Sequence, residues 1–330
     1  MNNRKTAILV LVVFSLAILA GCGGGQKAAD KPKTEQLFLL TGSTGGTYFA
    51  LGGAMANTWN KNLAGKVQIT PQPSGASVEN LKRIGKGEAQ LGMAMNNIAD
   101  QAWKGEGEAF KDTKAIKNFR SIGVIYPEVY QGFVAADSPA NTIADLKGMR
   151  VAVGPTGSGT AVISKDIFAE LGLNFSDFKP EFAGFGDAAS KFKDGHLDAN
   201  FGVLSVPAAA IQDVMTVRKI KMIEIKGADF DKLKAKYPFF SQFVIPAGTY
   251  GNAKDVYTIN MQAALYCKAD LKDDLVYELT KTFYEKSGEI AAAHAAGKYI
   301  KLEKALDGLT TPLHPGASKY YKEKGIRIPD

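Results

Sequence analysis

The residues with the clearest potential for chemistry are 41–48, with the sequence TGSTGGTY. They stand between an apolar run, residues 37–40, and a segment of helical periodicity, residues 49–60. Glycine lets a ligand approach the backbone closely, and Ser and Thr hydroxyls cap helices. The first N–H groups of a helix lack intrahelical acceptors and carry partial positive charge. A strand that turns into a helix here predicts a site for a phosphate or a carboxylate, although the same residues would also suit a plain tight turn.

A second copy of this pattern begins at Arg150. A strand at 150–153 leads through the loop GPTGSGT at 154–160 into an apolar-periodic helix at 161–171. In both copies a strand, a Gly turn, a helix and a Gly-acid turn into a further strand follow, so that residues 194–198 correspond to 86–90. Strands that alternate with helices predict βαβ units and a mainly parallel sheet. The repeat therefore predicts an α/β fold of two lobes, whose loops face a ligand cleft.

The remaining elements complete the two lobes. We expect the chain to cross to the second lobe at 134–139 and to return at 237–250, and two crossings form a hinge that permits closure over a ligand. Other expected strands lie at 67–70, 91–95, 119–126, 131–136, 180–182, 199–203, 220–225 and 256–260. Other expected helices lie at 78–84, 272–284 and 290–296, and one more begins at Asp187. The predicted lobe limits are 37–133 with 246–330 for the first lobe and 134–245 for the second.

The N-terminus indicates export. Residues 1–21 have a positive start, an apolar run of about 14 residues and a small-residue end, as in a secretory signal peptide. A bilayer span needs roughly 20 apolar residues. Residues 19–22, LAGC, resemble a lipoprotein lipobox, which implies acylation of Cys22, with plain secretion or a retained anchor as alternatives. Residues 22–36 then form a flexible tether. The predicted location is the periplasm or the outer face of the cell membrane.

The charge and cysteine content limit the kinds of ligand and cross-link that we expect. The formal net charge of the 330 residues is +7, but Lys and Arg are interspersed with acids, so no nucleic-acid patch is expected. A mild positive field would favour acidic ligands. If Cys22 carries lipid, Cys267 has no partner for an intramolecular disulfide, and we expect it to be a buried small hydrophobe.

Catalytic and cofactor motifs are missing from the sequence. The two loops at 41–48 and 154–160, which we call the first and second Gly/Thr loops, do not end in the Gly-Lys-Ser/Thr of a P-loop. Neither loop contains the dinucleotide pattern G-x-G-x-x-G. No G-x-S-x-G nucleophile elbow occurs near Ser74 or Ser158. His196, His294 and His314 lack the spacing of a zinc site. We therefore expect a binding protein without cofactor or metal, and not an enzyme.

An ordered set of motifs resembles the TAXI class of solute receptors, which serve tripartite ATP-independent periplasmic (TRAP) transporters. The resemblance runs from residue 37 to 321. The matching stretches are 41–48, 51–54, 73–81, 125–128, 145–148, 151–160, 245–250 and 312–317. It implies a type II periplasmic-binding-protein fold. It also implies a monomeric receptor that delivers a small carboxylate, an organic acid or amino acid that is glutamate- or 2-oxoglutarate-like, to the membrane subunits of an ion-gradient-driven permease.

The resemblance also implies a ligand site between the two Gly/Thr loops. The residues assigned to it are Ser43, Thr44, Gly45, Gly46, Thr47, Tyr48, Ser74, Gly75, Ser77, Asn96, Tyr126, Thr156, Gly157, Ser158, Gly159 and Thr160. Alternatives stay open, because Ser74 and Ser77 would also serve as helix caps only, Tyr126 as a core residue and Asn96 as a turn residue.

The sequence departs from other TRAP receptor classes, which fix the solute's carboxylate with a central arginine. Arg83 lies in a helical pattern, and Arg120 and Arg150 border strands. We therefore predict recognition by backbone N–H groups and hydroxyls at helix N-termini. Two rivals remain: a binding protein of the same fold for an ATP-driven importer or a sensor kinase, and an exported enzyme with a nucleophile such as Ser158.

Overall fold

The computed structural model describes residues 34–329. The predicted signal peptide, Cys22 and most of the predicted tether lie outside the described residues, so export and lipidation stay predictions. Within the described range, none of the helices has the length and apolar character needed to cross a bilayer.

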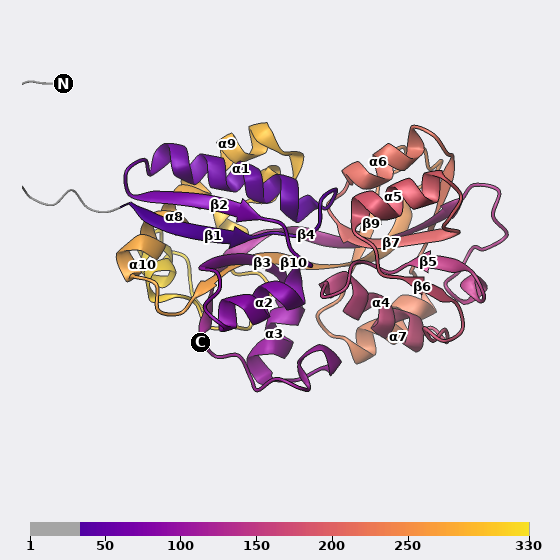
Figure 1. The fold of residues 1–330 in the computed structure, drawn as a ribbon, viewed down its shortest axis with the longest axis horizontal. Helices are drawn as coiled ribbons and strands as arrows, with labels where there is room; N and C mark the ends of the chain where they lie inside the picture. Colours follow the sequence, from indigo (N-terminus) through magenta and orange to yellow (C-terminus); the bar gives the residue numbers. More distant parts are fainter. Residues whose placement is uncertain (1–33, 330) are drawn as a thin grey trace, which may run out of the picture. The chain divides into compact units, whose positions relative to one another are not determined.

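Ten strands in the described residues form one mixed sheet (Figure 1). Their order is β2-β1-β3-β10-β4-β7-β5-β6, with β8 on β4 and β9 on β10. The strands are β1 (Glu35–Leu40), β2 (Val67–Gln72), β3 (Leu91–Met95), β4 (Phe119–Ala135), β5 (Arg150–Ala152), β6 (Lys179–Glu181), β7 (Ala199–Leu204), β8 (Ile220–Ile223), β9 (Ser241–Ile245) and β10 (Val256–Lys268). The α-helices are α1 (Thr47–Asn62), α2 (Ser77–Gly85), α3 (Asn96–Lys104), α4 (Gly159–Glu170), α5 (Phe185–Lys193), α6 (Ala209–Met215), α7 (Ala228–Lys236), α8 (Asp273–Glu285), α9 (Ser287–Ala293) and α10 (Pro315–Glu323).

The predicted internal repeat is confirmed by the strand pairing. β1 runs parallel to both β2 and β3, and β5 runs parallel to both β6 and β7. Each set is joined by a helix after its first and its second strand, so β1-α1-β2-α2-β3 has the same plan as β5-α4-β6-α5-β7. We call the elements around the first set the first lobe and those around the second set the second lobe (Figure 1).

Two long antiparallel strands, β4 and β10, pass from one lobe to the other. β4 pairs with β7 from Val129 to Val134, so the outward crossing precedes the predicted 134–139. The return crossing is β10 and not the predicted 237–250, where β9 pairs only with β10. The expected strands 119–126 and 131–136 are one continuous strand, because β10 pairs with β4 on both sides of Pro127. The predicted lobe limits stay a proposal.

Four helices in the described residues, α3, α6, α7 and α10, were missing from the sequence-based expectation. α3 begins directly at Asn96, which the sequence assigned to the ligand site with a turn residue as the alternative, and α7 lies just before the predicted return crossing at 237–250. α10 lies beyond 290–296, the last helix that the sequence indicated. Its N-cap is His314, whose Nδ1 accepts from Gly316 N at 3.1 Å, and Pro315 stands at the first helical position, as helix starts favour.

Apolar side chains on both faces of the sheet form the core. In the first lobe Trp59 of α1 stacks on Phe283 of α8 with ring centroids 5.8 Å apart, and its indole N–H donates to Leu279 O. Cys267 is fully buried, as predicted, and burial raises the pKa of its thiol. The core is therefore continuous from α1 through the sheet to the C-terminal helices.

Gly132 on β4 provides a test of this packing. A Cβ at Gly132 would lie 2.1 Å from Cε1 of the buried Phe201 ring on the neighbouring strand β7. We expect Gly132→Ala to lower the free energy of unfolding by about 3 kcal/mol, because overpacking displaces a ring with no free space around it. Urea unfolding measures this effect. The matched control is Gly53→Ala in α1, where a Cβ meets no atom within 4 Å. Equal stabilities of the two variants would contradict the packing described.

Candidate functional site

A small cavity lies where the two lobes meet. Its volume is about 20 Å³, which is about the space of one water molecule. A larger solute therefore enters only when the lobes move apart. Both lobes supply the walls, which consist of Gly42, Ser43, Gly46, Thr47, Tyr48, Ala76, Ser77, Met95, Tyr126, Glu128, Ser158, Gly159, Thr160, Phe185, Val203 and Leu204.

Four helices begin at this cavity. The first residues of α1, α2, α4 and α5 are Thr47, Ser77, Gly159 and Phe185, and all four line it. The first N–H groups of a helix have no intrahelical acceptor and carry partial positive charge. Two such helix ends come from each lobe, so partial positive charge lies on both sides of the cavity, although Phe185 N and Gly186 N of α5 are bonded to Ser43 Oγ and Thr44 O in this structure.

Two sets of contacts, which we call the first and second seams, join the lobes beside the cavity. The first seam joins the first Gly/Thr loop to the second lobe. Thr47 Oγ1 lies 3.1 Å from Ser205 Oγ and accepts from Ser205 N at 3.0 Å. Ser43 Oγ accepts from Phe185 N at 3.3 Å. The hydroxyls of this loop thus join the two lobes in the closed arrangement.

A second seam joins the start of α2 to the second Gly/Thr loop. Glu79 N donates to Gly157 O at 3.1 Å. A Cβ at Gly75 would lie 2.6 Å from Thr156 O, so only glycine permits the two backbones to approach this closely. Each Gly/Thr loop therefore contacts the opposite lobe beside the cavity.

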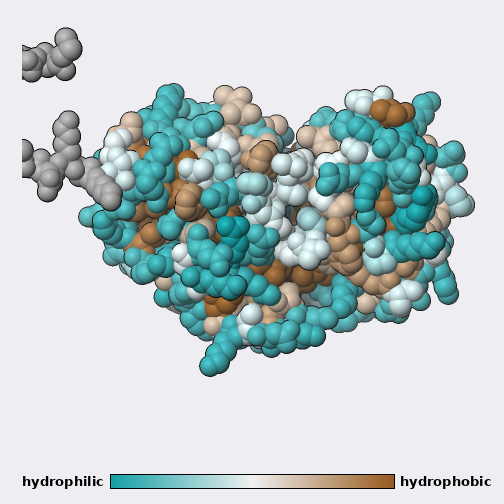
Figure 2. All heavy atoms as spheres, viewed as in Figure 1, coloured by the Kyte–Doolittle hydropathy of each residue, from teal (hydrophilic) through white to brown (hydrophobic). Residues whose placement is uncertain are grey.

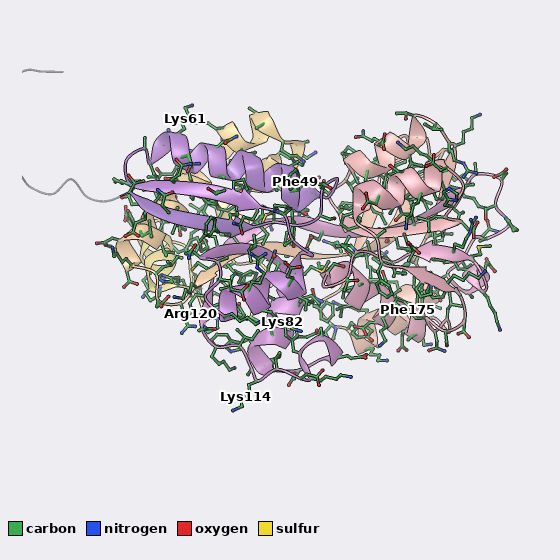
Figure 3. All side chains as sticks on the ribbon, in the orientation of Figure 1. Phe49, Lys61, Lys82, Lys114, Arg120 and Phe175 are labelled. Carbon is green, nitrogen blue, oxygen red and sulfur yellow. The ribbon has the colours of Figure 1, made fainter. Side chains whose placement is uncertain are left out.

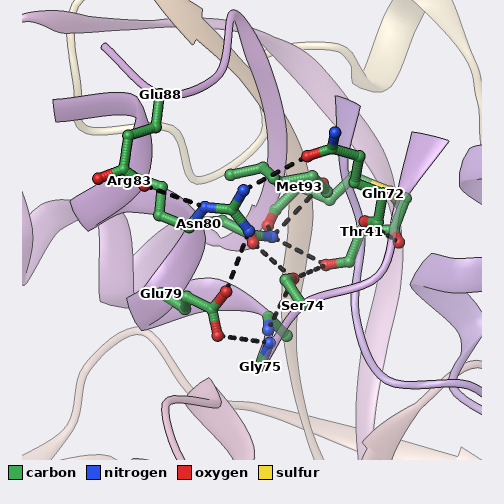
Figure 4. A network of polar contacts seen from close by, with 11 residues as sticks. Thr41, Gln72, Ser74, Gly75, Glu79, Asn80, Arg83, Glu88 and Met93 are labelled. Atoms are coloured by element: carbon green, nitrogen blue, oxygen red, sulfur yellow. Dashed lines mark hydrogen bonds and ion pairs between the residues drawn. The ribbon is translucent and has the colours of Figure 1, made fainter. Parts of the chain in front are cut away.

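Polar side chains behind the second seam hold the loop before α2 in place (Figure 4). Asn80 Nδ2 donates to Thr41 O and to Met93 O, each at 2.8 Å, and so connects the end of β1 to the middle of β3. Ser74 Oγ lies 2.6 Å from Asn80 Oδ1, and Gly75 N donates to Glu79 Oε2 at 2.8 Å. The Ser74 hydroxyl therefore supports the loop from within the first lobe.

The cavity also contains a carboxyl group that sequence reasoning missed. Glu128 lies on β4 and is 2% exposed. Its Oε2 accepts from the Tyr48 hydroxyl at 2.8 Å, and its Oε1 lies 3.4 Å from the Tyr126 hydroxyl. An acid within the largely apolar segment 122–136 is the signal that could have indicated it.

Burial raises the pKa of the Glu128 carboxyl from its ordinary 4.5 to about 8, although the hydrogen bonds from Tyr48 and Tyr126 work in the opposite direction. Desolvation disfavours the ionised form, so the carboxyl is mainly protonated at neutral pH. Burial and the neighbouring Glu128 also raise the pKa of both phenols.

The structure brings together nine of the sixteen residues that the sequence assigned to the site. These are Ser43, Gly46, Thr47, Tyr48, Ser77, Tyr126, Ser158, Gly159 and Thr160. Several of their hydroxyls have bonds within their own lobe: Ser77 Oγ accepts from Met95 N at 3.1 Å, and Ser158 Oγ accepts from Ala161 N at 3.0 Å as the N-cap of α4.

Seven assigned residues do not line the cavity: Thr44, Gly45, Ser74, Gly75, Asn96, Thr156 and Gly157. Most of them border it, as in the contact of Thr44 O with Gly186 N at 3.2 Å. Asn96 lies elsewhere, because its Nδ2 donates to Gly308 O at 2.7 Å and its Oδ1 accepts from Gln262 N at 3.2 Å. As the first residue of α3, Asn96 connects that helix to β10 and the C-terminal segment.

The described residues that line the cavity include no arginine. Figure 3 shows Arg120 in the first lobe, well away from Phe49, which marks the border between the lobes in the first turn of α1. Arg120 Nη1 donates to Lys117 O at 2.8 Å. In Figure 2 the border between the lobes is a pale band of intermediate hydropathy between mostly hydrophilic surfaces.

A family model matches nearly the whole described chain. The model of the NMT1-like family aligns with residues 39–325. The chain belongs to the NMT1-like family. A curated relative, the putative aliphatic sulfonates-binding protein of Escherichia coli (strain K12), is 38% identical over 66 residues, and the match spans only 20% of each chain.

Solved structures place this NMT1-like protein in the α/β fold of periplasmic binding proteins, as predicted. A protein from Bordetella bronchiseptica RB50 aligns with a TM-score of 0.52 at 17% identity, covering 90% of this chain and 91% of its own. A putative L-cystine ABC transporter from Listeria monocytogenes aligns with a TM-score of 0.50 at 16% identity, covering 82% of this chain and 98% of its own. At these identities the likeness concerns the fold.

Proposed function

We propose that this NMT1-like protein is an extracytoplasmic receptor that closes its two lobes around a small acidic solute and delivers the solute to a membrane importer. The observation that carries the proposal is the convergence of four helix N-termini, two from each lobe, on one cavity between the lobes. N–H groups that bind an anion from both sides couple binding to closure.

The importer is proposed as one of two types. The Listeria protein named above is described as part of an ABC transporter, and this favours an ATP-driven importer. The ordered TAXI-like motifs favour a TRAP permease. Reconstitution of the receptor with membrane subunits of each type distinguishes the two. Uptake that needs ATP supports the first type, and uptake that needs only an ion gradient supports the second.

An enzyme on the same scaffold has less support. The Ser158 hydroxyl caps α4, and none of the cavity walls contains a histidine that could activate it. Among the described residues, His294 caps the short helix at Ala295–Tyr299 and His314 caps α10, while His196 lies exposed on the surface. No cluster of three metal-ligating side chains occurs in this part of the chain. Lipid anchoring through Cys22 remains part of the proposal.

A thermal-shift panel of carboxylates, amino acids and sulfonates tests the receptor function. We expect at least one acid to raise the melting temperature by about 5 °C at a concentration 100 times its Kd, because ligand binding then adds about 2.7 kcal/mol to stability. Neutral sugars of similar size serve as controls. If every acid leaves the melting temperature unchanged at millimolar concentration, the proposed anion site is wrong.

A further inference from the structure

The carboxyl group of Glu128 has no cationic partner in the structure. Its polar contacts are two phenol hydroxyls, from Tyr48 of α1 and Tyr126 of β4. Across the sheet β10 places Met261 beside it, and the second lobe adds apolar walls at Val203 and Leu204. Among residues 34–329, no Lys, Arg or His forms an ion pair with it. A buried acid without a counter-charge is costly, and such groups are typical of functional sites.

We propose that Glu128 binds an ammonium group of the solute, so that the preferred ligand is a small zwitterion such as an amino acid or an aminosulfonate. This inference rests on the proposed receptor function and specifies its ligand class. The helix N-termini bind the acidic group, and Glu128 binds the cationic nitrogen.

The arrangement of Tyr48 supports two poles within one cavity. Its backbone belongs to the first turn of α1, where the N–H groups favour an anion. Its side-chain hydroxyl donates to Glu128 at 2.8 Å. One residue thus joins the anion-binding end of the cavity to the carboxyl end, and the two ends lie within the reach of a small molecule.

Proton exchange accompanies the proposed binding. In the closed, ligand-free arrangement Glu128 holds a proton at neutral pH because burial raises its pKa to about 8. An ammonium group beside it favours the ionised carboxylate. The carboxyl O–H bond therefore breaks, the proton goes to solvent, and the carboxylate accepts hydrogen bonds from the nitrogen. Tyr48 and Tyr126 stay neutral throughout, since burial raises the pKa of both phenols.

Matched ligand pairs test this inference by calorimetry. L-Glutamate is compared with 2-oxoglutarate, and taurine with ethanesulfonate, so that each pair differs in its amine. We expect the amine-bearing member of the preferred pair to bind about 100-fold more tightly. Measured in buffers of different ionisation enthalpy, its binding should release close to one proton at pH 7. At pH 9.5 Glu128 is already ionised and the free amine is partly deprotonated, so the release should give way to proton uptake by the amine.

Substitutions test whether the proton released on ligand binding comes from Glu128. Glu128→Gln should abolish both the preference for the amine and the proton release. The matched control is Asp166→Asn, because Asp166 is also a partly buried acid with a pKa raised by burial, to about 6, but lies on α4 outside the cavity. This control should keep both properties. Circular dichroism checks that both variants fold, and the proton release of the unmodified protein tests the inference without any substitution.

The possible failures are distinguishable. Equal binding of amine-bearing and amine-free ligands would overturn the role of Glu128 and leave the receptor function standing. Proton release on titration with NaCl alone would show that a metal cation, and not an ammonium group, binds beside Glu128. That result would overturn the inference as well. If none of the four compounds binds at millimolar concentration, the acidic-solute proposal falls, and this inference falls with it.

Discussion

Glu128→Gln should remove most of the fall in stability that the ligand-free protein undergoes between pH 5 and pH 9. In the folded protein the carboxyl has a pKa of about 8, compared with an ordinary value of 4.5. The folded state therefore binds the proton more tightly than the unfolded state. The stabilising effect of the proton is complete below pH 4.5, decreases as the pH rises, and is lost above pH 8. One pKa unit corresponds to about 1.4 kcal/mol, so we expect a loss on the order of a few kcal/mol.

Urea unfolding at pH 5, 7 and 9 measures this loss. Glutamine is neutral at every pH, so the variant should show a nearly flat profile across the window. Asp166→Asn is again the control, since burial raises the pKa of Asp166 from 3.8 only to about 6. That variant should keep the decrease between pH 6 and 8. A wild-type profile that is flat from pH 6 to 8 would show that Glu128 is already ionised in the free protein.

Gly75→Ala should keep the lobes from closing. The added Cβ would lie 2.6 Å from Thr156 O, which is a backbone atom of the opposite lobe and cannot move aside alone. The φ angle of Gly75 lies outside the left-handed region, so alanine is not strained by its own backbone. We expect solute affinity to fall at least tenfold, or about 1.4 kcal/mol, with little change in the stability of the open form.

Small-angle scattering and calorimetry measure the two effects. With saturating solute, the radius of gyration of Gly75→Ala should remain larger than that of the wild type. Gly53→Ala, which adds the same methyl group to open space on α1, should bind and close normally. A Gly75→Ala protein with wild-type affinity and compaction would mean that closure does not bring the start of α2 against residues 156–157.

The sequence alone determined the repeated α/β plan, because its signals are local. Apolar runs followed by Gly/Thr loops and 3.6-residue periodicity predicted both β1-α1-β2-α2-β3 and β5-α4-β6-α5-β7. The same loops indicated helix N-termini suited to an anion, and nine of the sixteen assigned residues line the cavity. A strand, its turn and its helix occupy the continuous stretches 35–62 and 150–170, so propensity and capping specify them without distant contacts.

Only the tertiary structure decided which polar groups face the solute cavity. Asn96 has a polar side chain at the end of β3, yet its amide binds Gly308 and Gln262, which are remote in sequence. Glu128 lies in an apolar strand, and its burial results from α1, β10 and the second lobe closing around it. A pKa depends on the atoms that exclude water from the group. Those atoms come from segments more than 70 residues apart, as Tyr48 and Glu128 illustrate. No local sequence pattern predicts a contact between such distant segments.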